Sequence, residues 1–124
     1  MANGALYLDL QKLWWTVITT KQKEKLKSSW GDKASSMACL AEVRVFDPLS
    51  AWECYIYAMN PENEDEICCL IKGFFVEVCE WRLSELASRF NADGEPLQID
   101  YEYRPRRAAE LFKILNEGYE RRRY

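Results

Sequence analysis

Residues 43–106 read VRVFDPLSAWECYIYAMNPENEDEICCLIKGFFVEVCEWRLSELASRFNADGEPLQIDYEYRPR, a run of short alternating segments separated by turn-forming residues. Near its start, Val43 and Val45 alternate with Arg44, which is the period of two typical of a half-buried strand. Residues 52–59 alternate in the same way and place aromatic side chains on both sides. The pattern predicts a sheet of short strands joined by turns.

Turn residues set the limits of the other strands. Asn60 and Pro61 should stop the second strand, since proline cannot donate to a strand ladder, and residues 60–66 are expected to form the hairpin connection. Gly73 marks the next turn. Further strands are then predicted at residues 67–71, 75–81 and 97–103, the last with the most regular alternation.

The N-terminal part of the chain is expected to be helical. Thr19 and Gln22 have the spacing of a capping box, which favours a short helix ending near Ser28, before Gly31 and Asp32. Large aromatic residues flank this helix, and they are interpreted either as packing residues or as part of an exposed contact patch: Trp14, Trp15 and Trp30.

Two more helices are predicted after the strands. Ser84 can cap a short helix with Leu86, Ala87 and Phe90 on one face. The last helix is expected over residues 106–118, with Gly118 as its C-terminal cap. Its apolar face has helical spacing and consists of Ala108, Leu111, Phe112 and Leu115.

These elements predict one α+β domain over residues 1–124, with about five mostly antiparallel strands and two or three helices packed on one face. Residues 1–40 form a helical N-terminal extension, residues 41–118 the core, and residues 119–124 an exposed basic tail. A chain of 124 residues with 48% hydrophobic residues is long enough for one such core.

Composition excludes several classes of protein. A formal charge of −3 gives no global attraction for nucleic acid or anionic membrane. Asp9, Gln11 and Lys12 interrupt the apolar N-terminus, so it is neither a signal-peptide core nor a membrane span. We therefore expect a soluble, cytoplasmic protein that does not contact a membrane.

The five cysteines are interpreted as reduced packing residues, with a metal site, a redox switch or a reactive thiol as alternatives. They contain no CxxC pair, and the chain has no histidine, so no metal or other cofactor is expected. Adjacent Cys68 and Cys69 should point to opposite faces of a strand, which would leave one of them accessible. The remaining three are Cys39, Cys54 and Cys79.

Catalytic motifs are also missing. Without histidine there is no Ser-His or Cys-His nucleophile, and the scattered glycines form neither a P-loop nor a dinucleotide-binding turn. A carboxylate hydrolase remains an alternative if acidic groups meet across a sheet face, although a solvated face is the simpler interpretation. The groups concerned are Glu77, Glu80, Asp100 and Glu102. We expect a non-enzymatic protein.

Two charged segments are the candidate contact sites. The acidic turn, Glu62, Glu64, Asp65 and Glu66, either keeps a hairpin soluble or binds a basic groove of a partner. Calcium binding is not expected there, because the spacing and glycine of an EF-hand loop are missing. The arginine-rich segment near the C-terminus could contact nucleic acid or merely solubilise the chain: Arg104, Arg106, Arg107, Arg121, Arg122 and Arg123.

Short motifs between residues 42 and 111 carry a family resemblance. They are residues 43–48, 50–55, 73–77 and 83–86, followed by the Gly-Glu-Pro-Leu loop at 94–97 and by residues 99–105. In order and spacing they resemble the domain-of-unknown-function family 2958, which is associated with plasmids, integrated elements and phages. The segment between Trp15 and Ala41, the acidic turn and the arginine-rich tail are additions to the family core.

That resemblance implies an accessory protein of a mobile genetic element, with no family residues of known catalytic role to transfer. We expect it to bind and inhibit a host defence complex, a protein or ribonucleoprotein, in the manner of an anti-CRISPR protein. The alternative is a nucleic-acid-binding accessory factor that uses the arginine-rich segment. Exposed aromatics and edge strands also leave a homodimer open.

Overall fold

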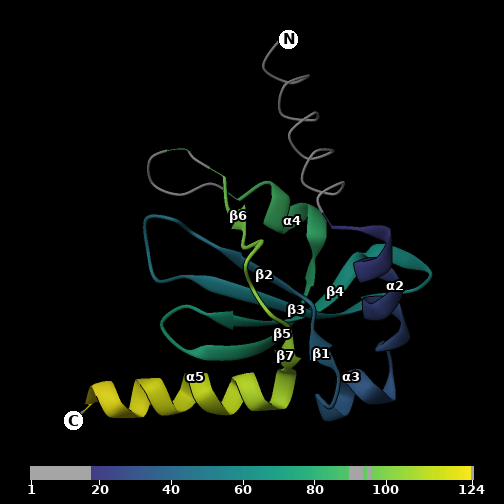
Figure 1. Cartoon of the computed structure of the whole chain (residues 1–124). Helices are drawn as coiled ribbons and strands as arrows, with labels where there is room; N and C mark the ends of the chain where they lie inside the picture. Colours follow the sequence, from purple (N-terminus) through teal and green to yellow (C-terminus); the bar gives the residue numbers. More distant parts are fainter. Residues whose placement is uncertain (1–17, 90–93, 95, 124) are drawn as a thin grey trace.

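The computed structural model describes residues 18–89, 94 and 96–123, and for residues 119–123 it describes the backbone only (Figure 1). Predictions made for Trp14, Trp15, Phe90 and Tyr124 lie outside this part of the chain. In chain order the elements are α2 (Thr20–Ser28), α3 (Asp32–Ser36), β1 (Leu40–Ala41), β2 (Val43–Phe46), β3 (Glu53–Asn60), β4 (Asn63–Lys72), β5 (Val76–Arg82), α4 (Leu83–Ala87), β6 (Gln98–Ile99), β7 (Arg106–Arg107) and α5 (Ala108–Arg123).

An antiparallel sheet forms the centre of the molecule. Its five strands lie in the order β5-β4-β3-β2-β6, and each pair of neighbours is antiparallel. A separate two-stranded sheet pairs β1 with β7, which brings the segment before β2 beside the start of α5. This arrangement confirms the predicted α+β class and the five-stranded antiparallel sheet.

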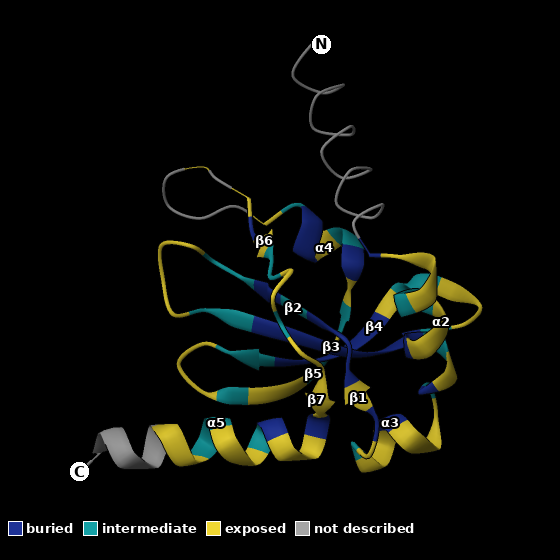
Figure 2. Ribbon diagram, in the orientation of Figure 1, coloured by how far each residue is buried: buried dark blue, intermediate teal, exposed yellow. Residues whose placement is uncertain are grey.

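Helices cover both faces of the sheet, whereas we expected them on one face. On the first face, α2 and α4 pack against Val45, Ile56 and Cys69. On the second face, α3 and α5 pack against Tyr57 and Leu70. Because β3 carries apolar side chains on both sides, each side needs a covering layer. Figure 2 shows the result, with the central strands buried and the outward surfaces of the helices exposed.

A β-bulge interrupts the alternation of β3. Ile56 pairs with Cys69 and Ala58 pairs with Cys68, so Tyr57 is an extra residue on the β3 side of the ladder. Both Tyr57 and Ala58 therefore belong to the hydrophobic cluster of the second face. Strict alternation already places Tyr57 on this face, so the residue that the bulge adds to it is Ala58, and Met59 returns to the first face.

The prediction for the adjacent cysteines is half right. Cys69 belongs to the cluster of the first face and Cys68 to that of the second, which confirms their opposite orientation. Both are nevertheless buried, because helices cover both faces. No cysteine of the described residues forms a disulfide, and the described part of the chain holds no cluster of metal-ligating groups.

The capping box of α2 is confirmed. The Gln22 N–H donates to the Thr19 hydroxyl oxygen at 3.1 Å, and the Thr19 N–H donates to the Gln22 side-chain oxygen at 3.0 Å. Leu26 is the residue that α2 buries against the sheet. None of the helices in residues 18–89 and 96–123 is long and apolar enough to cross a membrane.

The strand predicted at residues 97–103 was wrong beyond Ile99. Asp100 ends β6, because its side chain accepts a hydrogen bond from the Glu102 N–H at 3.0 Å and turns the chain. Tyr103 then points back to the second face, where its ring meets the Tyr55 ring and its hydroxyl donates to the Ala41 carbonyl at 2.8 Å. A local side-chain hydrogen bond therefore overrides the alternating pattern.

The C-terminal helix also differs from the prediction. Its predicted apolar face is confirmed, since Ala108 and Leu111 are buried in the second cluster. The helix continues through Gly118 to Arg123, so residues 119–123 extend α5 and are not a separate tail. A glycine inside a helix costs only about 1 kcal/mol relative to alanine, which does not suffice to end it.

Asp65 provides the cap that we had assigned to Ser84. The Ser84 N–H donates to the Asp65 carboxylate at 2.8 Å and the Ser84 hydroxyl donates to it at 3.0 Å. Ser84 lies inside α4, whose N-cap position is Arg82. The first turn of α4 is thus held by a carboxylate from the neighbouring strand β4, which sequence spacing alone does not reveal.

We expect Asp65→Ala to lower the free energy of unfolding by about 1–2 kcal/mol, since it leaves the α4 donors without a partner. Urea denaturation measures this change. Glu62→Ala is the matched control, because the Glu62 side chain is exposed in the adjacent turn, and it should shift stability by less than about 0.5 kcal/mol. Equal stabilities for the Asp65 variant and the wild type would contradict the capping role.

Candidate interaction surfaces

The predicted acidic turn is shorter than expected. Strand β3 ends at Asn60 and β4 begins at Asn63, so only Pro61 and Glu62 connect them. Glu64, Asp65 and Glu66 belong to β4. The expected seven-residue connection over 60–66 was therefore wrong, because three of its acidic residues continue the strand.

Most of these carboxylates contact the protein itself. Glu64 binds Lys27 at 3.2 Å and lies 3.8 Å from the Lys23 ammonium, which ties α2 to β4. Glu66 accepts a hydrogen bond from the Asn60 amide at 2.9 Å. The Glu62 carboxylate has no ion-pair or hydrogen-bond partner among the described residues. The four residues are thus not a uniform free patch, and Asp65 and Glu64 have structural contacts.

The predicted arginine-rich segment is divided in space. Arg104, Arg106 and Arg107 are exposed around β7, where Arg106 lies 3.7 Å from Glu110. Residues 121–123 are at the far end of α5 (Figure 1), and a rise of 1.5 Å per residue separates them from β7 by roughly 20 Å. The six arginines therefore do not form one compact patch.

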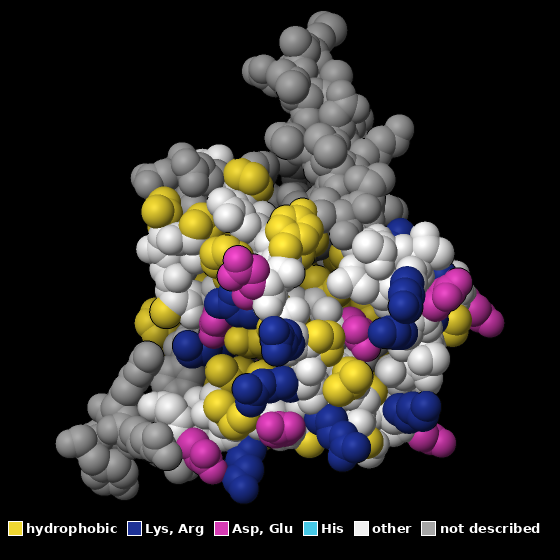
Figure 3. Space-filling view, viewed as in Figure 1, with side chains coloured by type: hydrophobic (Ala, Val, Ile, Leu, Met, Phe, Trp, Pro, Cys, Tyr) yellow, Lys and Arg dark blue, Asp and Glu magenta, His cyan; other side chains and the backbone are white. Residues whose placement is uncertain are grey.

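Charges of both signs share the surface. Figure 3 shows lysine and arginine side chains among aspartate and glutamate side chains on the face of the molecule seen there. Because the charges of opposite sign are mixed, the electrostatic field of the basic or of the acidic side chains is weak at a distance. The visible face offers short-range contacts and no broad basic track.

The four carboxylates considered for a hydrolase do not converge. Glu77 and Glu80 are on β5 at one edge of the sheet, and Asp100 and Glu102 follow β6 at the opposite edge. Asp100 instead binds the Arg44 guanidinium at 2.8 Å. They therefore do not meet across one face, which was the alternative to a solvated face, because the strand order places three other strands between the two pairs.

Arg44 is the centre of a partly buried ionic network. It binds Asp100 and Glu53, and the Lys72 ammonium lies 3.3 Å from the other Glu53 oxygen. Burial alone raises the pKa of Glu53, but hydrogen bonding and charge from Arg44 and Lys72 outweigh it and hold the pKa below its usual value. The network links β2, β3, β4 and the end of β6, so its role is structural.

An exposed apolar surface lies at the end of the sheet away from the acidic turn. Glu53 pairs with Lys72, so the loop before β3 and the turn after β4 come together at this end. The aromatic end, as we call it, consists of Trp52 from the first segment and Phe74 and Phe75 from the second. The exposed fractions are 95% for Phe74 and 70% for Phe75.

The aromatic end surrounds a hollow. It has a volume of about 490 Å³ and lies against Trp52 and Ile71. The exposed side chains of Glu77 and Arg89 also contact this hollow. An apolar centre bordered by charged residues has the anatomy of a protein interface.

Neighbouring residues fix the position of the aromatic end. The Trp52 and Trp81 rings meet edge to face at 6.3 Å, and the Arg89 guanidinium lies over the Trp52 ring at 4.9 Å. In the loop before β3, Asp47 accepts hydrogen bonds from the Leu49 N–H at 3.0 Å and the Ser50 hydroxyl at 2.8 Å. Because these contacts already hold the loop in place, binding a partner would cost less conformational entropy.

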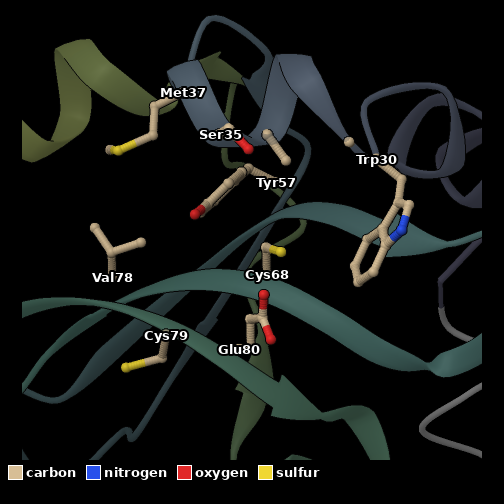
Figure 4. A pocket seen from close by; sticks show the side chains of 10 residues that line it. Trp30, Ser35, Met37, Tyr57, Cys68, Val78, Cys79 and Glu80 are labelled. Carbon is tan, nitrogen blue, oxygen red and sulfur yellow. The ribbon is translucent and has the colours of Figure 1, made fainter.

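A second hollow of about 490 Å³ lies between α3 and strands β4 and β5 (Figure 4). We call it the α3 hollow, and its lining includes Trp30, Tyr57, Cys68 and Glu80. Burial raises the pKa of Cys68 to about 11, and the nearby Glu80 charge adds to the shift. The Cys68 thiol is therefore protonated at neutral pH and is a poor nucleophile.

No family model matches the chain, and no curated protein or solved structure matches it. The resemblance to family 2958 accordingly stays a prediction.

Sequence reasoning missed the aromatic end. The available signal was the pair Phe74-Phe75 directly after Gly73, since turns are usually polar and two exposed phenylalanines in a turn are unusual. The contribution of Trp52 could not be seen, because it depends on the pairing of β3 with β4.

Proposed function

We propose that the protein acts by binding a macromolecular partner, not by turnover, and that the aromatic end is its contact surface. The observation that carries this proposal is the near-complete exposure of Phe74 beside Phe75 in the turn between β4 and β5. Aromatic side chains dominate the energetics of protein interfaces, and their exposure in water is unfavourable. A partner that covers them would recover that free energy.

The proposed partner is a host protein or ribonucleoprotein complex. This part of the proposal comes from the resemblance to a plasmid- and phage-associated family, and it makes the chain a mobile-element accessory protein that inhibits a host defence complex in the manner of an anti-CRISPR protein. Occupying a functional surface of such a complex requires no catalytic residues. Surface complementarity alone supplies the inhibition.

Acidic residues have a secondary role in this proposal. Glu77 at the rim of the aromatic end and Glu62 in the opposite turn are both exposed. Rim charges of this kind influence the association rate and the choice of partner more than the affinity. Glu64 and Asp65 contribute less, because their carboxylates already bind α2 and α4.

The alternative function, nucleic-acid binding, rests on the three exposed arginines at β7. A pull-down experiment distinguishes the two proposals. The immobilised chain is incubated with bacterial lysate, once with nuclease and once without it, and the captured proteins are compared. We expect the same proteins to be captured in both cases, and equally by a variant with Arg104, Arg106 and Arg107 changed to Gln. Capture that disappears after nuclease treatment, or with the arginine variant, would favour the alternative.

A further inference from the structure

Strand β5 is a long edge strand with one free side. It is the outermost strand of the sheet, and all seven of its residues pair with β4 on the inner side. In the described part of the chain, no strand pairs with its outer side. An unpaired edge presents a row of N–H and C=O groups that can accept an added strand.

Two hollows meet along this edge on the second face. The α3 hollow includes Val78 and Glu80 of β5, and a neighbouring hollow of about 340 Å³ includes Glu80 and Arg82. Both are lined by Trp30 and Glu80, so they adjoin in one groove that follows β5 from Val78 to Arg82 and ends beside Glu85 of α4. An added strand would therefore have space for its side chains next to β5.

The charges in this groove point to a basic occupant. Three carboxylates line it, from Glu66, Glu80 and Glu85, against one guanidinium from Arg82. Glu80 and Glu85 have no ion-pair partner among the described residues, and Glu66 accepts hydrogen bonds only from neutral amides. The Trp30 ring is a surface on which an ammonium or guanidinium group can lie.

The two faces of β5 differ in a way that fits an amphipathic strand. Glu80 is on the second face, because it pairs with Cys68 of the second cluster. Cys79 and Trp81 pack against the apolar cluster of the first face. An added strand that alternates basic and apolar residues would thus meet carboxylates on one side and apolar groups on the other.

We propose that the free edge of β5 binds an extended protein segment that alternates lysine or arginine with apolar residues. The segment adds to the sheet as a sixth strand, and a basic side chain enters the groove beside Glu80 and Trp30. The groove shares no lining residue with the aromatic end, and the proposed binding does not depend on the function proposed above. The occupant is defined by its basic side chains and by an extended backbone that can pair with β5.

Fluorescence anisotropy with two labelled octapeptides tests the proposal. One peptide alternates lysine and valine, and the other alternates glutamate and valine. We expect the wild-type chain to bind the lysine peptide and not the glutamate peptide, with weaker binding as salt is added. Glu80→Gln should weaken binding on the order of fivefold, and Glu80→Lys should weaken it further.

The matched control is Glu77→Gln, which removes a carboxylate from the same strand but on the opposite face, and it should leave binding of the lysine peptide unchanged. Amide hydrogen exchange provides the backbone readout, since strand addition should slow exchange in residues 76–82. The Phe74→Ser/Phe75→Ser variant should still bind the peptide, which separates this proposal from the aromatic end. Equal binding of both peptides, equal effects of the two glutamate variants, or unchanged β5 exchange would overturn it.

Discussion

The Phe74→Ser/Phe75→Ser double variant should bind its captured partner about a hundredfold more weakly than the wild-type chain. Both rings are mostly exposed in the free protein, so their burial at an interface would contribute fully to binding. Removing a central aromatic contact typically costs about 2 kcal/mol or more, and a hundredfold change in affinity corresponds to about 2.7 kcal/mol. Calorimetric or surface-based titration of the purified partner measures the difference.

Folding should survive this change, because exposed side chains contribute little to stability. Urea denaturation of the double variant should match the wild type to within about 0.5 kcal/mol. Tyr101→Ser is the matched control: its side chain is 77% exposed and lies in the turn after β6, away from the aromatic end. A hundredfold loss with Tyr101→Ser, or none with the double variant, would contradict the assigned surface.

Arg44→Met should lower the free energy of unfolding by about 2–3 kcal/mol at neutral pH. The change leaves Glu53 with Lys72 as its remaining basic partner and deprives Asp100 of its guanidinium. Breaking a fully buried ion pair costs more, but these side chains are one-sixth to one-quarter exposed, so solvent reduces the loss. Arg104→Met is the control, since Arg104 is exposed and makes no ion pair among the described residues.

Acid should reduce the difference between Arg44→Met and the wild type. The pKa of Glu53 is lowered in the folded chain from an ordinary value of 4.5, so the stability it contributes is present above about pH 4.5. That contribution is lost as the pH falls through the folded pKa, because the carboxylate takes up a proton. Denaturation curves between neutral and acidic pH test this, and a difference that is constant with pH would contradict the role of Glu53.

The period-two pattern allowed most of the sheet to be predicted from sequence. It located the strands around Val45 and Ile56, since alternation depends only on neighbouring residues, and turn residues located the strand around Cys69. It failed after Ile99, where the Asp100 side chain forms a turn that alternation does not encode. The pattern also did not predict that helices cover both faces of the sheet, because the position of a helix relative to the sheet depends on tertiary packing.

The candidate surfaces were harder to predict than the strands. Sequence identified the acidic residues, but not that Glu64 would bind Lys27, which is 37 residues away in the chain. Nor could it show that the loop containing Leu49 would lie beside Phe74, or that Trp30 and Glu80 would line one hollow. Each of these contacts depends on how helices and strands pack in the folded chain, and local composition carries no information about that packing.

The heat capacity change of binding tests the central claim most directly. If the aromatic end is the contact surface, calorimetric titration of the captured partner at several temperatures should give a negative heat capacity change, because apolar surface leaves water. The change should become clearly smaller in magnitude with Phe74→Ser/Phe75→Ser and remain the same with Tyr101→Ser. A heat capacity change near zero, or one that is identical in the wild type and the double variant, would contradict binding through the aromatic end.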